Sequence, residues 1–284
     1  MIATTGFFDG VHCGHRLVIE RLVCAAKAGG DKSLVVTFWP HPRAVLQDGA
    51  RDLRLLTTLG EKRSMLERLG VDRIEVLDFS RDFAALTAER YLREVLQERF
   101  GVTTLFVGYD NRLGSDRLTA ASLLPLARRF GMEVVELPPL GDISSTKIRH
   151  ALEEGRVEDA AGMLGYGYPL EGAVVAGNRL GRTIGFPTAN MQLYEPLKLV
   201  PARGVYMVQA EVLGKSYRGM TNIGTRPTVG GTIPTIETHL LDFDEDIYGL
   251  SLRITFLRRI RDEIRFPSLD ALKKQLETDR EACR

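Results

Sequence analysis

The sequence predicts an α/β protein of two domains: a parallel sheet covered by helices, followed by an antiparallel β domain with a terminal helix. Three observations support this. Strand-like and helix-like segments alternate through the first half, short β segments separated by Gly and Pro follow, and the 284 residues exceed the length of an ordinary single domain. We predict the boundary near residue 166, which gives domains 1–166 and 167–284.

The first half opens with a strand-like segment at 2–7 and a helix at 15–28 with apolar residues at helical spacing. The short β-branched and aromatic run at 34–39 is typical of a strand buried on both faces. The alternation continues with helices at 59–69, 88–100 and 118–130, and strands at 74–79, 103–108 and 133–137. Because such sheets bind ligands beyond the carboxyl ends of their strands, we look for a site in the loops that follow strands.

The pattern changes near Gly165. The β segments that follow are 170–176, 204–213, 215–224, 236–241 and 250–258. Short segments of this kind, separated by Gly and Pro, favour an antiparallel barrel or sandwich. A helix at about 269–281 ends the chain, with Ser268 as its N-cap.

The composition excludes several classes of protein. With 38 basic and 37 acidic residues, the net charge of +1 leaves no global electrostatic footprint for nucleic acid or an anionic membrane. No apolar run reaches the about 18 residues of a membrane-spanning helix, and the start lacks the regions of a signal peptide. Three cysteines without disulfide spacing predict a reducing, cytoplasmic location. The chain begins inside its first strand, which suggests that a few residues are missing before Met1.

A Gly-rich turn joins the first strand to the first helix and reads Gly6-Phe-Phe-Asp-Gly-Val-His-Cys-Gly-His15. His12 and His15 flank Gly14 where backbone N–H groups gather at a helix N-terminus, an arrangement that suits a polyphosphate. Donors fixed there would stabilise the charge that develops on an attacked α-phosphate. A purely structural turn is one alternative. Zinc is another, but it needs four ligands, and the sequence has no second Cys or His cluster.

A second candidate phosphate site follows the last strand of the first half. Ser145, Thr146 and Arg149 place hydroxyls and a cation at the start of a helix. Helix capping alone is the alternative, because Ser and Thr cap helices generally. The combination with the histidine turn favours phosphate binding.

Two more loops follow strands of the first half. Asp110 and Arg112 lie after the strand at 103–108 and are expected at the same crevice. His41 lies between two prolines after the strand at 34–39. It either lines the pocket or belongs to a stiff turn.

The most specific stretch of the second half runs from Gly177 to Asn190, Gly-Asn-Arg-Leu-Gly-Arg-Thr-Ile-Gly-Phe-Pro-Thr-Ala-Asn. Its glycines permit a close backbone approach to phosphates, and a cation lies beside them. The residues expected at the phosphates are Gly177, Gly181, Arg182 and Gly185. It is no Walker loop, because Gly-Lys-Ser/Thr is absent; a Gly-rich hairpin with an Asx turn is the alternative.

Thr188 and Asn190 end this stretch two residues apart, so an extended segment places both side chains on one face. A hydroxyl and an amide oxygen suit Mg²⁺ that keeps waters and ATP oxygens as its other ligands. Glu237 alternates with apolar Ile236 on a short strand and could accept a proton from an attacking hydroxyl. A solvated strand face is the alternative for this carboxylate. His239 is expected to be structural.

The motifs of the first half resemble the adenylyltransferase half of bacterial bifunctional riboflavin kinase/FAD synthetase, which belongs to the HxGH nucleotidyltransferase superfamily. The resemblance implies a Rossmann-like domain in which His12 and His15 contact ATP phosphates and Ser145, Thr146 and Arg149 close on them. It also implies that Asp110, with His41, lies at the flavin or nucleotide pocket. The chain departs from the family pattern at the aromatic pair before Asp9, where the family commonly has Asn, and at Asn111 and Leu113, where it often has aromatic residues.

Roughly residues 167 to 281 are similar to riboflavin kinase in the order and spacing of their motifs. The resemblance implies a six-stranded antiparallel barrel with a terminal helix and Mg²⁺ bound through Thr188 and Asn190. It also implies that Glu237 is the general base for the ribityl 5′-hydroxyl. The loop after Ile260, with Arg261, Glu263 and Phe266, would cover the isoalloxazine.

The sequence therefore predicts an enzyme that phosphorylates riboflavin to FMN with Mg-ATP and then adenylylates FMN to FAD with release of pyrophosphate. Two alternatives stay open: a riboflavin kinase with a weak or inactive adenylyltransferase half, and a non-catalytic flavin-binding protein. The expected partners are small molecules, with no nucleic acid and no membrane. The sequence does not reveal the oligomeric state.

Overall fold

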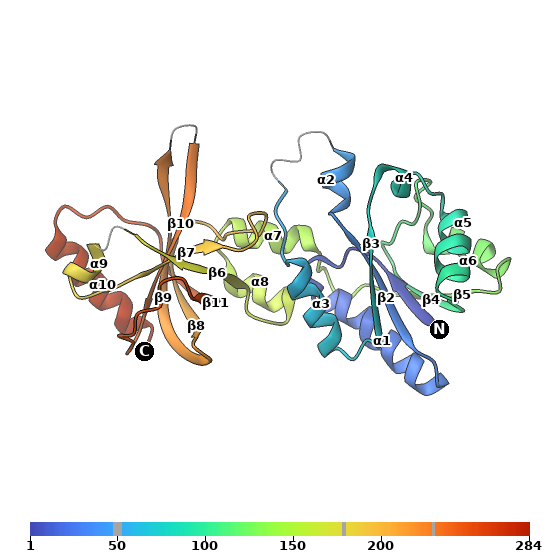
Figure 1. Ribbon diagram of the computed structural model, residues 1–284, viewed down its shortest axis with the longest axis horizontal. Helices are drawn as coiled ribbons and strands as arrows, with labels where there is room; N and C mark the ends of the chain where they lie inside the picture. Colours follow the sequence, from blue (N-terminus) through green and yellow to red (C-terminus); the bar gives the residue numbers. More distant parts are fainter. Residues whose placement is uncertain (48–52, 178–179, 229–230) are drawn as a thin grey trace. The chain divides into compact units, whose positions relative to one another are not determined.

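The computed structural model describes the chain except residues 48–52, 178–179 and 229–230 (Figure 1). The contacts within the chain define two compact units, Met1–Ser145 and Thr146–Arg284. The first is a parallel α/β unit and the second is an antiparallel barrel with helices, which confirms the predicted fold class. No helix within the described ranges is long and apolar enough to cross a membrane.

The first unit contains a five-stranded parallel sheet in the order β3-β2-β1-β4-β5. The strands are β1 Ile2–Thr5, β2 Ser33–Trp39, β3 Arg73–Asp78, β4 Thr104–Gly108 and β5 Glu133–Leu137. All five were predicted to within two residues at each end. The chain adds β2 and β3 on one side of β1, and β4 and β5 on the other. The order therefore reverses between β1 and β4, and a crevice for a ligand forms at such a point.

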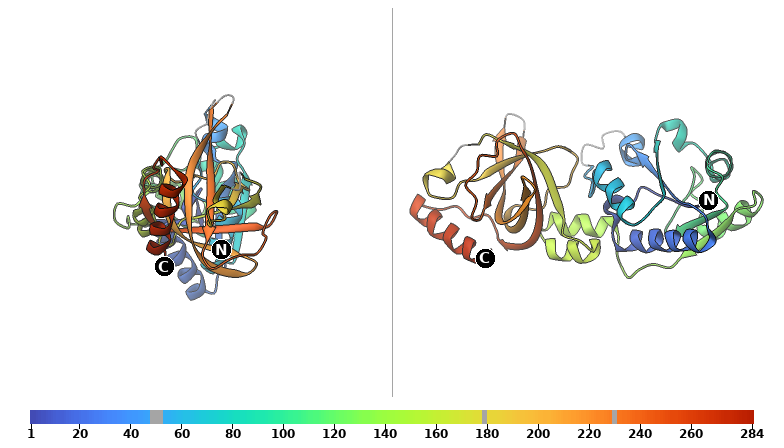
Figure 2. Two further views of the ribbon diagram at one scale, coloured as in Figure 1. Left: turned by 90° about the vertical axis from the view of Figure 1, so that its left-hand side faces the viewer. Right: turned by 60° about the horizontal axis from the view of Figure 1, so that its bottom comes forward.

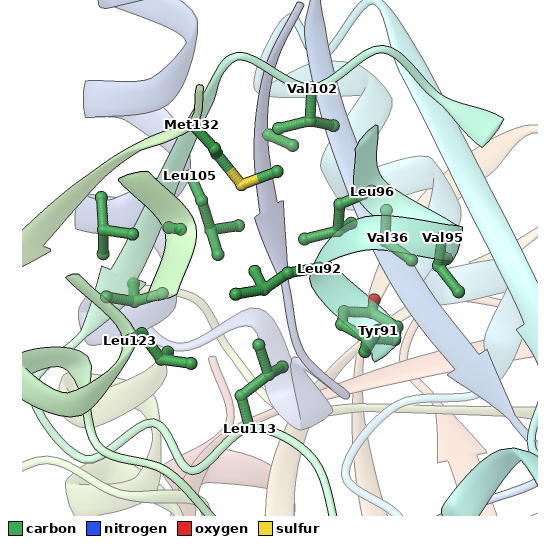
Figure 3. Packing of buried hydrophobic residues seen from close by; sticks show 14 of the residues in the cluster. Val36, Tyr91, Leu92, Val95, Leu96, Val102, Leu105, Leu113, Leu123 and Met132 are labelled. Carbon is green, nitrogen blue, oxygen red and sulfur yellow. The ribbon is translucent and has the colours of Figure 1, made fainter. Parts of the chain in front are cut away.

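Helices cover both faces of this sheet, because neighbouring residues of one strand contribute to different apolar clusters. Ala3 and Leu34 belong to one cluster, whereas Ile2 and Val35 belong to the other. Figure 3 shows the first cluster, where side chains of η3 (Tyr91–Arg99), among them Leu92 and Leu96, pack against the sheet. The helical segments are η1 Asp9–Val11, α1 Cys13–Gly29, α2 Pro42–Leu46, α3 Leu59–Arg68, α4 Arg81–Ala84, α5 Ala88–Arg90, the π-helix η3 Tyr91–Arg99, and α6 Ala120–Arg128.

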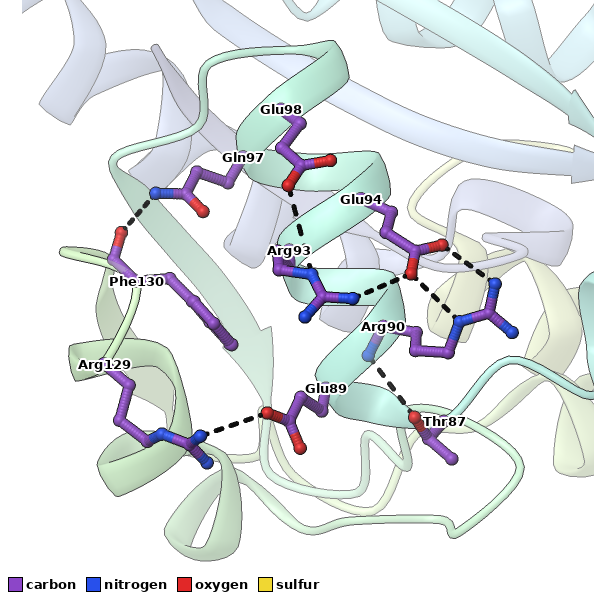
Figure 4. A network of polar contacts seen from close by, with 9 residues as sticks. All are labelled: Thr87, Glu89, Arg90, Arg93, Glu94, Gln97, Glu98, Arg129 and Phe130. Carbon is purple, nitrogen blue, oxygen red and sulfur yellow. Dashed lines mark hydrogen bonds and ion pairs between the residues drawn. The ribbon is translucent and has the colours of Figure 1, made fainter.

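The outer face of α5 and η3 carries a network of charged side chains (Figure 4). Glu94 accepts hydrogen bonds from Arg90 and Arg93, and Arg129 on the neighbouring segment contacts Glu89 at 3.3 Å. Because these pairs are exposed and screened by water, they contribute little to stability. The position of η3 therefore depends on the apolar side chains beneath it.

The second unit is a closed antiparallel barrel of six strands in the order β10-β7-β6-β11-β8-β9. This confirms the six-stranded barrel and excludes the sandwich. The strands are β6 Pro169–Val175, β7 Ala189–Leu193, β8 Gly204–Val212, β9 Lys215–Thr228, β10 Gly231–Leu240 and β11 Ser251–Arg261. The sequence predicted five of them; β7 was treated only as an extended segment because it is short and directly follows the Gly-rich stretch.

Four helices accompany the barrel: α7 Ser145–Glu153, α8 Val157–Leu164, α9 Leu180–Thr183 and α10 Leu269–Ala282. The terminal helix α10 lies against the outside of the barrel (Figure 2), and Ser268 caps it by accepting a hydrogen bond from the N–H of Ala271, as predicted. Apart from Ser145, helices α7 and α8 belong to the barrel unit by their contacts. One such contact joins the N–H of Ala202 to the carbonyl of Leu152. The domain limits 1–166 and 167–284 stay a proposal.

Candidate functional site

The histidine turn has an unusual backbone that brings both imidazoles to the start of α1. Phe8 and Val11 have positive φ angles of 54° and 37°, which are uncommon for such residues and cluster at functional sites. His12 is the N-cap of α1, and its Nδ1 accepts a hydrogen bond from the N–H of His15. The two rings stack with centroids 3.6 Å apart. A Cβ at Gly14 would lie 3.2 Å from the His12 ring, so Gly keeps this stack open.

Burial makes both histidines poor bases. It lowers the pKa of His12 to about 4, although the nearby carboxylates of Asp110 and Asp9 act in the opposite direction. The pKa of His15 lies well below its ordinary value because the ring is buried and because His12 and Lys62 are close. Both rings are therefore neutral at pH 7, so each can donate one N–H to an anion. Within the described residues, no three His, Cys, Asp or Glu side chains are arranged to hold a metal ion.

Asp9 holds the turn in place through hydrogen bonds of its carboxylate, a role that was not expected from the sequence. Its buried carboxylate accepts hydrogen bonds from the N–H groups of Leu56 and Thr57 at 3.0–3.1 Å and from the Thr57 hydroxyl at 3.1 Å. The Thr57 hydroxyl also accepts a hydrogen bond from the N–H of Gly10. These bonds fix the turn to the segment that leads into α3.

Ser145 lies beside the histidine turn, where its hydroxyl donates to the carbonyl of Asp9 at 2.9 Å. The structure thus brings together two of the predicted phosphate-binding motifs. Thr146 and Arg149 follow on α7, beyond the division between the two units. Their approach to His12 and His15 stays a prediction.

A cavity of about 590 Å³ opens beyond the carboxyl ends of β1, β2 and β4. Asp110 and Arg112 line it, as does Gly6. Its apolar wall is aromatic and includes Phe7, Phe38, Phe79, Phe83 and Tyr91. The sequence predicted the two charged residues at this crevice but not the aromatic wall, whose members come from separate segments.

His41 is a structural residue of this region. Its Nδ1 accepts a hydrogen bond from the N–H of Arg43 and caps α2. Its ring packs against Phe7 with centroids 4.2 Å apart. Phe7 and Pro42 line the cavity, so His41 lies next to two of its wall residues. Its assignment to the flavin pocket stays a prediction.

In the barrel, the predicted base and metal ligand lie side by side. Glu237 on β10 pairs with Asn190 on β7 and, across its other edge, with Asn222 on β9. Directly paired residues of adjacent antiparallel strands have Cβ atoms about 5 Å apart. The carboxylate is therefore flanked by two amide side chains, which are neutral hydrogen-bonding groups.

Two cavities of the barrel unit meet at Thr188. One, of about 410 Å³, is lined by Arg182, Thr188 and the segment around Phe243. The other, of about 260 Å³, is lined by Thr188, Glu237 and Asn222 together with Arg261, Glu263 and Phe266. Thr188 is a lining residue of both cavities.

The glycines of the 177–190 stretch are required by the chain itself. A Cβ at Gly177 would lie 2.2 Å from Nδ2 of Asn190, and one at Gly181 would lie 2.1 Å from the carbonyl oxygen of Phe186. Gly185 has a φ of 85°, a left-handed conformation. The sequence predicted that phosphates approach the backbone at these glycines. At Gly177 and Gly181 the close neighbours are instead protein groups, the Asn190 amide and the Phe186 carbonyl.

For the riboflavin kinase activity that the sequence predicts, Gly177→Ala is expected to displace the Asn190 amide and to raise the KM for Mg-ATP by about tenfold or more, a loss of about 1.4 kcal/mol. Initial rates at varied Mg-ATP and saturating riboflavin measure this. Gly162→Ala on α8 is the matched control, because a Cβ there would meet nothing within 4 Å. An unchanged KM in Gly177→Ala would show that the amide position is unimportant.

Arg261 lines the same cavity as Glu263 and Phe266, and its place at the flavin stays a prediction. It is the last residue of β11 and not part of the following loop. Its guanidinium forms a two-pronged ion pair with Asp279 of α10, at 2.7 and 3.0 Å, and lies over the Phe266 ring. Asp279 is 1% exposed. The burial of Asp279 could not be expected from the sequence, because an acidic residue on a polar helix usually faces solvent.

His239, which was expected to be structural, binds a backbone carbonyl and also lines the cavity that contains Glu237. Its Nδ1 lies 2.8 Å from the carbonyl oxygen of Pro187, so it holds the strand entry that precedes Thr188. Burial lowers its pKa, which keeps the ring neutral at pH 7. The side chain therefore positions the segment and carries no charge there.

A five-stranded parallel α/β unit followed by a six-stranded antiparallel barrel defines a two-domain α/β protein with candidate ligand cavities in both units. Residues 1–151 match the FAD synthetase family and residues 164–284 match the riboflavin kinase family. The chain belongs to the bifunctional riboflavin kinase/FMN adenylyltransferase family.

Relatives and a solved structure agree with this. The bifunctional riboflavin kinase/FMN adenylyltransferase of Escherichia coli K12 is 39% identical over 284 residues, which cover 98% of this chain and 90% of that protein. The protein of the same name from Bacillus subtilis is 37% identical over 287 residues, with 99% and 90% covered. A crystal structure from Streptococcus pneumoniae, described as a macrolide-efflux protein, has 37% identity and a TM-score of 0.94, and covers 100% of this chain and 93% of that one. It supports the fold of both units.

Proposed function

We propose that the barrel unit transfers the γ-phosphoryl group of Mg-ATP to riboflavin, and that the first unit transfers the adenylyl group of a second ATP to the FMN so formed. The observation that carries the first half of the proposal is the meeting of two cavities at Thr188, with Glu237 in one of them. The nucleotide occupies the larger cavity with Arg182 at its phosphates, and riboflavin occupies the smaller one.

Glu237 acts as the general base in the kinase reaction. It accepts the proton of the ribityl 5′-hydroxyl as that oxygen bonds to the γ-phosphorus, and the bond to ADP breaks. The amides of Asn190 and Asn222 flank the carboxylate and orient it. Phe266 and Glu263 form the outer wall of the flavin cavity, and Asp279 holds Arg261 beside them.

Thr188 and Asn190 would hold the Mg²⁺ ion. The residues fit this role: both are half-buried, and they present a hydroxyl and an amide oxygen two residues apart, next to a carboxylate. When bound, the ion would neutralise charge on the phosphates of ATP. The protein contributes the position of its two ligands, which Gly177 and Pro187 constrain.

The first unit needs no protein nucleophile, because the phosphate of FMN itself attacks the α-phosphorus of ATP. His12 and His15 donate ring N–H groups at the N-terminus of α1, where they stabilise the charge that develops on the phosphate oxygens. The aromatic cavity fits an isoalloxazine ring, with Asp110 at its edge. Ser145, whose hydroxyl binds the carbonyl of Asp9 in the histidine turn, lies beside these phosphates.

The experiment that tests the proposal is incubation of the purified protein with riboflavin, ATP and Mg²⁺, with the flavins resolved by chromatography over time. FMN should appear first and FAD should follow. FMN that accumulates without FAD would support the kinase-only alternative, which Phe8 and Asn111 motivate as departures from the family pattern. No conversion at all would support a flavin-binding protein. We place these reactions in the cytoplasm, since Cys13, Cys24 and Cys283 form no disulfide within the described residues.

A further inference from the structure

Lys62 is a buried cation of the first unit whose ammonium lies against an aromatic ring. It lies in the first turn of α3 and is only 1% exposed. Within the described part of the chain its Nζ has no hydrogen-bond partner. The ammonium lies 3.5 Å from the centre of the Phe7 ring. Lysines are almost never fully buried unless they are paired, so such a group needs an explanation.

The position of Lys62 is fixed relative to the histidine turn. Asp9 binds the backbone of Leu56 and Thr57, and α3 begins two residues later. Lys62 thereby comes close enough to His15 to lower the pKa of that ring. Nδ1 of His15 is also buried and without a hydrogen-bond partner among the residues described. Two buried polar groups without hydrogen-bond partners among the described residues thus lie near one another at the start of α1.

We propose that Lys62 binds the oxygens of ATP that leave as pyrophosphate in adenylyl transfer. This assignment rests on the proposed function of the first unit. In the reaction, an FMN phosphate oxygen bonds to the α-phosphorus and the bond to the bridging oxygen breaks. The electron pair of that bond stays on pyrophosphate, where the ammonium neutralises the added charge. No proton has to move.

The surroundings favour ATP over the flavin as the ligand of Lys62. Phe7 lines the aromatic cavity, but Lys62 does not. The ammonium instead lies near His15, at the helix N-terminus that suits phosphates. Burial lowers the pKa of Lys62 to about 8, against the attraction of Asp9. The amine is therefore still mostly protonated at pH 7, and a bound polyphosphate would raise its pKa further.

The stability of Lys62→Met distinguishes a structural lysine from a ligand-binding lysine. If the ammonium stabilised the empty protein, its removal would lower the unfolding midpoint. If the ammonium instead serves to bind an anion, Lys62→Met removes a buried charge that has no hydrogen-bond partner within the described residues and keeps the apolar stem. The unfolding midpoint should then stay unchanged or rise. Trp39 is the one tryptophan of the sequence and lies on β2, so its fluorescence reports unfolding of the first unit.

The test compares Lys62→Met, Lys62→Arg and the control Arg63→Met, whose exposed side chain pairs with Glu67 on the same helix. Rates are measured for FAD formation from FMN and ATP, and for the reverse reaction from FAD and pyrophosphate. We expect Lys62→Met to slow FAD formation by about 10²–10³-fold and to raise the KM for pyrophosphate at least tenfold. Lys62→Arg should restore part of this loss, and Arg63→Met should behave like the wild type.

The outcomes separate the inference from the proposed function. A wild-type protein that makes no FAD from FMN would refute the function of the first unit. A wild-type protein that makes FAD while Lys62→Met makes it equally fast would refute the role of Lys62. An increase in the KM for FMN alone would also overturn the assignment, because it would show that the ammonium binds the attacking phosphate of FMN. A lower Trp39 midpoint in Lys62→Met would indicate a structural lysine. Riboflavin phosphorylation serves as an internal control for the barrel unit.

Discussion

Replacement of Glu237 by Gln is expected to lower the rate of FMN formation by about 10²–10⁴-fold, the usual contribution of a positioned general base. The substitution keeps the shape and the hydrogen-bonding reach of the side chain but removes its ability to take the proton of the ribityl hydroxyl. Conversion of added FMN to FAD should stay at the wild-type rate, because Glu237 belongs to the barrel unit. Chromatography of the flavins after incubation with either riboflavin or FMN measures both reactions in one preparation.

Glu211→Gln is the matched control for this experiment. Glu211 is an exposed glutamate on β8 of the same barrel, and it is absent from the lining of the barrel cavities. It should leave both rates unchanged. If Glu237→Gln formed FMN at the wild-type rate, the carboxylate would have no catalytic role, and the register with Asn190 and Asn222 would need another explanation.

Much of the fold could be predicted because its signals are local. The alternation of segments in the first half and the Gly and Pro punctuation of the second follow from rules that act over a few residues. The histidine turn and the 177–190 stretch are equally local, so their residues could be named from the sequence. The strand β7 was not predicted as a separate element, since its five residues are few for a periodic pattern.

The missed residues depend on contacts between distant segments. Lys62 lies among charged residues of α3, including Glu61 and Arg63, and such a pattern is typical of a solvent-exposed helix. Its burial results from the hydrogen bonds of Asp9 to backbone groups 47 and 48 residues away. Asp279 becomes buried by pairing with Arg261, 18 residues earlier in the chain. No short-range rule relates these partners.

Replacement of His15 by Ala is expected to slow FAD formation by about 10²–10³-fold, the effect of removing one fixed donor to a developing oxyanion. FMN formation should be unaffected. The ring stacks on His12 and meets the edge of Phe8, so Trp39 fluorescence should be used to verify that the first unit stays folded. His150→Ala is the control, because its imidazole is 66% exposed and pairs only with Glu154 among the ion pairs found in the described residues.

The two variants together make a stronger test than either alone. Glu237→Gln should convert FMN but not riboflavin, and His15→Ala should stop at FMN. An equal mixture should form FAD from riboflavin, because free FMN can pass from one variant to the other. If the mixture fails although each variant performs its own reaction, FMN is not released between the steps.

If His15→Ala alone forms FAD at the wild-type rate, the histidine turn binds nucleotide without stabilising the transfer, and the role assigned to its ring N–H is wrong.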